Sequence, residues 1–183
     1  MTMTSPLFAT TVKRVEQATV LDRPADAVAA ALDSALRPPV WAALHGTWLG
    51  HPVHPLLITL PIGCWASASL LDVSGRSPRA AQQLVGAGII GAVGAAVTGL
   101  ADWRTTTGAG RRVGLVHAAS NSVALGAYVA SWRLRAAGKH RAGAVVAVAG
   151  AVALAAGGYL GGHLSYALGA NVAGNDPARI AAR

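Results

Sequence analysis

Four ionisable residues stand at the ends of four long apolar segments, and their types suit metal chemistry. His54 opens the first segment, Asp102 ends the second, His117 lies about one turn inside the third, and His163 closes the fourth. If consecutive segments form antiparallel helices, all four residues lie at the same end of a bundle. Imidazole binds Zn, Cu and Fe well, so this placement indicates a metal or haem site at that end.

Further polar residues follow the helical repeat around these histidines. Asn121 comes four residues after His117, so it lies on the same face of the predicted helix and can orient that imidazole. Tyr159 lies four residues before His163 and shares its helical face. We expect both side chains to support the candidate ligands.

One site that fits these residues is a b-type haem held by two axial histidines. His117 and His163 are the preferred ligands, with His54 third. Small residues along the segments leave room for the ring. Three arginines at the same end suit the haem propionates: Arg104, Arg111 and Arg112. Such a cofactor would serve electron transfer.

The same residues allow two other interpretations. A single transition-metal ion could be held by His54, His117 and His163, with Asp102 as the fourth ligand or as a hydrogen-bond partner. Alternatively, the cluster holds no cofactor and clasps the helices, with each interhelical hydrogen bond contributing about 0.6 kcal/mol.

Other catalytic signatures are missing from the sequence. It has no glycine-rich phosphate loop, no nucleophile elbow and no cysteine–histidine motif. Its single cysteine, Cys64, cannot form an intramolecular disulfide. We therefore assign no catalytic residue and do not expect a stand-alone enzyme.

Composition indicates an integral membrane protein. Of the 183 residues, 53% are apolar and only 12% are charged, whereas soluble domains carry about 25% charged residues. The formal net charge of +8 could suggest nucleic acid, but the basic residues stand between apolar segments and form no stripe. That distribution favours loops beside lipid headgroups and excludes a nucleic-acid partner.

The apolar segments define the fold class. They cover about residues 54–73, 80–101, 113–132 and 142–164, and spanning a bilayer takes about 20 apolar residues. Pro61 and Gly63 predict a kink in the first segment. Small residues recur at spacing four, as close helix contact in lipid requires. The prediction is an all-α, four-helix transmembrane bundle over residues 54–172, with a C-terminal tail over 173–183 and homo-oligomerisation left open.

Residues 1–53 form a polar N-terminal extension with short interfacial helices. Pro24 suits the first position of a helix ending near Leu36. In residues 40–49, Trp41 and Trp48 share a helical face, which is typical of a membrane interface; a loop packed on the domain is the alternative. Nine basic residues fall on the side of both termini and six on the other, which predicts cytoplasmic termini.

Four motifs in order resemble one family. They are GHPVHP at residues 50–55, GLADW at 99–103, RVGLVHAASN at 112–121 and GGHLSY at 161–166. As a set spanning about residues 41–172, they resemble the domain-of-unknown-function 2231 family of predicted bacterial membrane proteins. Thr59 departs from the acidic residue or histidine common in the family, which argues against a ligand inside the first segment.

This resemblance implies a multi-pass protein of the bacterial inner membrane without an established activity. Some relatives continue into a Rieske-type iron–sulfur domain, which implies electron transfer. With one cysteine, the sequence carries no Rieske centre of its own. The redox partner would then be a separate protein or a membrane quinone.

Overall fold

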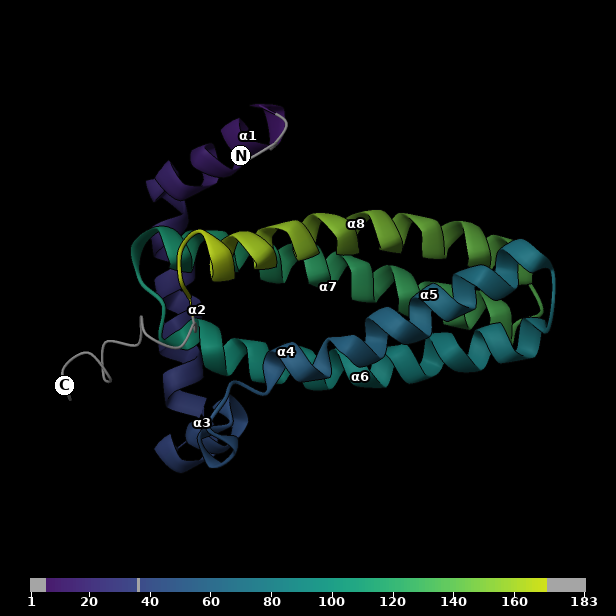
Figure 1. The fold of residues 1–183 in the computed structure, drawn as a ribbon, viewed down its shortest axis with the longest axis horizontal. Helices are drawn as coiled ribbons and strands as arrows, with labels where there is room; N and C mark the ends of the chain where they lie inside the picture. Colours follow the sequence, from purple (N-terminus) through teal and green to yellow (C-terminus); the bar gives the residue numbers. More distant parts are fainter. Residues whose placement is uncertain (1–5, 36, 171–183) are drawn as a thin grey trace.

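Four long helices form an all-α bundle in the computed structural model, which describes residues 6–35 and 37–170. They are α5 (Thr59–Ser74), which follows the short α4 (His54–Leu57), α6 (Pro78–Arg104), α7 (Gly108–Ala136) and α8 (His140–Tyr166). Figure 1 shows these helices running alongside one another, joined by short turns. The predicted fold class is therefore confirmed.

Each of these helical segments is long and apolar enough to cross a membrane. The third is longer than predicted, since α7 covers Gly108–Ala136 in place of residues 113–132. Arg111 and Arg112 therefore belong to the first turns of a helix and not to a loop. The apolar pattern misses these turns because the helix continues past the hydrophobic stretch into the polar rim.

The first spanning segment is interrupted, as its proline predicts. A short α4 ends at Leu57, and α5 begins at Thr59. Pro61 has no amide hydrogen to donate to the carbonyl of Leu57, four residues earlier, so the regular hydrogen bonding is broken there. The break positions His54 on a separate helical turn.

Two helical hairpins make up the bundle, α5 with α6 and α7 with α8, and α6 also packs on α7. At their centre the rings of Trp65 and Tyr128 stack with centroids 3.7 Å apart. The indole N–H of Trp65 donates to the Val85 carbonyl, and Gly88 gives the indole its space. The small residues of the sequence thus lie where large side chains of a neighbouring helix need room.

The N-terminal helices gather at one end of the bundle, where α4 begins and α8 ends (Figure 1). They are α1 (Pro6–Gln17), the 3-10 turn η1 (Thr19–Leu21), α2 (Asp22–Ala35), α3 (Pro38–His45) and the 3-10 turn η2 (Thr47–Leu49). The sequence did not predict α1, and α2 begins two residues before Pro24. Position 36, the predicted helix end, and residues 171–183, which include the predicted tail, lie outside the described residues.

The predicted tryptophan face of residues 40–49 is wrong. Gly46 adopts a left-handed conformation, with φ of 95°, and ends α3. Trp41 is buried against the bundle, whereas Trp48 follows on η2 and is 71% exposed. The two indoles therefore do not share one helical face.

Candidate functional site

His54 and His117 face each other near the rim of the bundle, one from each hairpin. Their ring centroids are 6.4 Å apart, and the ring planes are nearly perpendicular. His54 is carried by α4, which packs on α6, and His117 is carried by α7, which packs on α8. The pair therefore bridges the two halves of the molecule.

The same atom of each ring is hydrogen-bonded to a neighbouring helix. Nδ1 of His54 donates to the Ala95 carbonyl of α6 at 2.7 Å, and Nδ1 of His117 donates to the Gly157 carbonyl of α8 at 2.8 Å. Because a carbonyl oxygen can only accept, both Nδ1 atoms must carry the proton. In the neutral rings, both Nε2 atoms are then unprotonated and carry a lone pair, as a metal ligand requires.

Asn121 lies beside His117, as its spacing predicts. Its amide nitrogen is 3.1 Å from Nε2 of His117 and can donate to that lone pair. Gly157 makes this possible, since a Cβ atom there would lie 2.5 Å from the Asn121 Oδ1 atom. Glycines also border both rings: a Cβ on Gly99 would come within 2.9 Å of His54, and one on Gly161 within 2.9 Å of His117.

The structure gives Asp102 a different partner. Its carboxylate accepts a hydrogen bond from Nδ1 of His45 at 2.6 Å, and the aspartate side chain is only 7% exposed. His45 comes from α3, outside the four spanning helices. His45 was not among the predicted site residues, although it stands shortly before the first span, on the same side as His54, His117 and His163.

His163 is also paired away from the two facing histidines. Its Nε2 atom lies 2.6 Å from a carboxylate oxygen of Glu16 in α1. Tyr159, one turn earlier on α8, contacts the ring of Phe8, also in α1. These residues therefore attach α1 to the bundle. Glu16 could be found from sequence only by first recognising α1 as an amphipathic helix.

The three arginines bind acids of α2. Arg104 pairs with Asp33, Arg111 with Asp26, and Arg112 with Asp22. These contacts replace the haem propionates that the sequence suggested as partners. They also explain the spacing of the acids in α2, which lie on the face turned towards the ends of α6 and α7.

The contact of Arg112 with Asp22 is made by two nitrogen atoms of the guanidinium. Nε of Arg112 donates to Oδ1 of Asp22 at 2.6 Å, and Nη2 donates to Oδ2 at 2.9 Å. These hydrogen bonds, with the positive charge of Arg112, hold the pKa of the Asp22 carboxyl below its usual value. Nη1 of Arg112 also donates to the Glu16 carbonyl, so one side chain anchors both α1 and α2.

The four-residue metal set is therefore divided among three places. His54 and His117 lie together, Asp102 binds His45, and His163 binds Glu16. Among residues 6–35 and 37–170, no group of three or more histidine, cysteine or acidic residues is arranged to hold a metal ion. Of the four predicted ligands, only His54 and His117 therefore lie together.

Fold and site define a multi-pass α-helical membrane protein with a polar, histidine-bearing rim. A family model described as a predicted membrane protein, DUF2231, matches residues 50–174. The chain belongs to this family, as its motifs indicated. No curated protein and no solved structure matches the chain.

Proposed function

We propose that this protein carries electrons in the membrane through a haem b, or another transition metal, bound between His54 and His117. The supporting observation is the shared tautomer: both rings donate Nδ1–H to a backbone carbonyl, which leaves each Nε2 atom unprotonated and able to bind a metal. The ring centroids are 6.4 Å apart. Two imidazoles on opposite sides of one metal, each bound at about 2.0–2.1 Å, place their ring centres roughly 6 Å apart.

Haem fits a two-histidine pair better than a bare ion does. A bare ion needs further protein ligands, and none join His54 and His117 among the described residues. A porphyrin supplies four nitrogen ligands itself and requires only axial ligands. A ring between the two imidazoles would require the hairpins to separate along α5 and α8, which have little contact with each other, because Gly99 and Gly161 already lie against the imidazoles.

The chain's own residues would then set the properties of the centre. Bound haem supplies one-electron exchange. The Ala95 and Gly157 carbonyls orient the two imidazoles and raise their basicity. A metal on Nε2 of His117 would take the place of the Asn121 amide, which contacts that atom in the structure.

We further propose that the protein lies in the inner membrane of a bacterium with both termini in the cytoplasm, where basic residues are more numerous. Its partner would be a separate redox protein or a membrane quinone.

A cofactor-free clasp is the second candidate. The carbonyl contacts of both histidines, and the contact of Asn121 with Nε2 of His117, would join the helices without any metal. In this case, substituting these residues would lower the stability of the protein and would not change its absorption spectrum.

An absorption spectrum of the detergent-solubilised protein, produced with added haem precursor, separates the candidates. We expect reduced-minus-oxidised haem bands that His54→Ala and His117→Ala abolish and that His51→Ala, an exposed control, retains. Metal without haem bands would favour a bare ion. If the protein is colourless and elemental analysis finds no metal, haem and metal binding are excluded. Destabilisation by His117→Ala would then support the cofactor-free clasp.

A further inference from the structure

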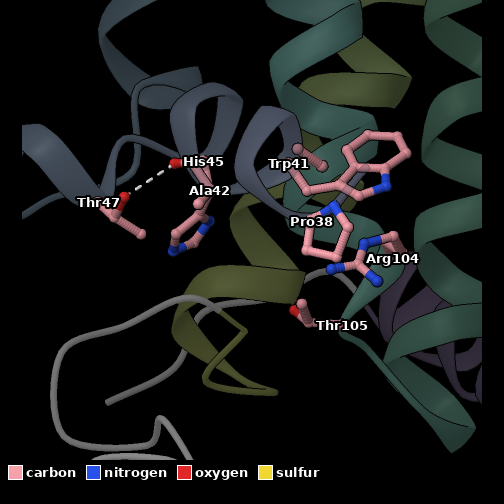
Figure 2. Close-up of a pocket in the computed structure, with 8 residues that line it drawn as sticks. Pro38, Trp41, Ala42, His45, Thr47, Arg104 and Thr105 are labelled. Carbon is pink, nitrogen blue, oxygen red and sulfur yellow. Dashed lines mark hydrogen bonds between the residues drawn. The ribbon is translucent and has the colours of Figure 1, made fainter. Parts of the chain in front are cut away.

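A small pocket lies at the polar rim, between α3 and the end of α6 (Figure 2). Its volume is about 210 Å³. Pro38, Trp41 and Ala101 supply apolar wall, and His45 and Arg104 supply polar groups. The pocket is distinct from the His54–His117 pair.

Two buried hydrogen-bond donors of the lining residues Trp41 and Arg104 have no acceptor in the part of the chain that the structure describes. Trp41 is 5% exposed, and neither its indole N–H nor the Nε–H of Arg104 has a partner among the described residues. Leaving a buried donor unpaired costs about 1–3 kcal/mol. The guanidinium carbon of Arg104 is 5.3 Å from the Trp41 ring centroid, and Figure 2 shows the indole nitrogen on the edge nearest that guanidinium. The two donors together suit a ligand with an acceptor oxygen.

His45 adds a group able to exchange a proton. Its Nδ1 atom is held by the buried Asp102 carboxylate, so its Nε2 atom remains for a ligand. An imidazole oriented by a carboxylate in this way is suited to proton transfer. This feature favours a ligand whose oxygen gains or loses a proton.

Charge and size argue against a phospholipid headgroup. Arg104 is already paired with Asp33 at 2.7 Å, and the Asp102 carboxylate lies behind His45, so the pocket offers no uncompensated positive charge for a phosphate. Pockets for drug-sized ligands usually measure about 300–1,000 Å³, so this one has room for a single substituted ring.

Exposed apolar side chains stand next to the pocket in the chain. Val40 of α3 and Trp48 and Leu49 of η2 are exposed apolar residues next to it in the chain, and such residues are typical of a membrane interface. A ligand could therefore place a polar head in the pocket and leave an apolar tail in the bilayer.

We propose that this pocket binds the head group of a lipid-soluble quinone. One ring carbonyl accepts from the Trp41 indole and the Nε–H of Arg104, after the guanidinium moves off the indole edge, and His45 serves the ring's other oxygen. The choice of a redox ligand rests on the proposed electron-transfer function, but binding of the oxidised ring does not require that function.

Calorimetric titration of the full-length protein in detergent with oxidised decylubiquinone tests the proposal. We expect saturable binding, weakened roughly fivefold to tenfold by Trp41→Phe and by Arg104→Lys, because each removes one donor. Trp48→Phe, outside the pocket, should leave the affinity unchanged. The His117→Ala protein should still bind the quinone, which separates this test from that of the haem.

Three results would overturn the proposal. The first is the absence of saturable binding. The second is that Trp41→Phe and Arg104→Lys bind the quinone as tightly as the Trp48→Phe control does. The third is displacement of the quinone by dioleoyl phosphatidylglycerol at equal micellar concentration. The last result would make the pocket a phospholipid site.

Discussion

Arg135 of α7 and Asp72 of α5 join the two helical hairpins at the end of the bundle opposite His54 and His117. Nη1 and Nη2 of the arginine donate to the two carboxylate oxygens at 2.7 and 2.5 Å. The arginine is 1% exposed. Its Nε atom donates to the Ser131 hydroxyl, which in turn donates to the Gly143 carbonyl of α8. One buried charge thus connects three helices.

Removing Arg135 should strongly destabilise the bundle. Arg135→Met leaves Asp72 without its partner, and breaking a buried pair on one side costs about 3–5 kcal/mol. Unfolding in detergent measures the loss, with the exposed Arg133→Met as control. The double variant Asp72→Asn/Arg135→Met should recover most of it. A single variant as stable as the control would show that the pair contributes little.

Two adjacent glycines of α8 should respond in opposite ways to alanine. In Gly157→Ala the new Cβ meets Asn121 Oδ1 at 2.5 Å, and such overpacking costs about 1–3 kcal/mol. Gly158 has nothing within 4 Å of an added Cβ, so Gly158→Ala should be neutral or stabilise the helix by up to about 1 kcal/mol. Thermal unfolding compares them, and equal melting temperatures would contradict the packing described for Asn121.

Acid should loosen the attachment of α2. Arg112 lowers the pKa of Asp22 in the folded protein, so this group stabilises the fold above its unfolded pKa, and that contribution is lost as pH falls through the lower, folded pKa. Between about pH 5 and 3, the protection of α2 amides against exchange, taken relative to the intrinsic rate at each pH, should fall more steeply in the wild type than in Asp22→Asn. Parallel pH profiles would exclude Asp22 as a source of this dependence.

His163 should matter for α1 and not for a bound cofactor. Because its Nε2 atom contacts Glu16, His163→Gln should increase amide exchange in α1 and leave any haem or metal content unchanged. Glu16→Gln serves as the matched change on the other side of the contact. Loss of cofactor in His163→Gln alone would return His163 to the ligand set.

Sequence periodicity was sufficient for the spanning helices because their apolar length is set by the bilayer. The kink was equally readable, since Pro61 acts through its own missing amide hydrogen. The helix over Pro6–Gln17 was not predicted, because Val12 is buried only through contact with α7 and α8. The stability of this helix depends on packing against α7 and α8, which the local sequence does not reveal.

The candidate site was predictable only to the level of the rim. Placing His54, His117, His163 and Asp102 at one end follows from antiparallel spans, but which of them meet depends on helix rotation and on α1 and α3. His45 and Glu16 supply partners from outside the spans, and no spacing rule links them to Asp102 or His163. The Asp72–Arg135 pair could have been predicted in the same way. Both residues lie near the C-terminal ends of their spans, at the end of the bundle away from His54 and His117.

The contacts of α2 have a consequence for the lipid that this protein requires. Arginines at the ends of membrane helices commonly recruit anionic headgroups as counter-ions, but Arg104, Arg111 and Arg112 take theirs from Asp33, Asp26 and Asp22 of the same chain. The carboxylates of α2 thus neutralise the arginines that acidic lipids would otherwise neutralise. The bundle therefore brings its own counter-charge into whatever bilayer surrounds it.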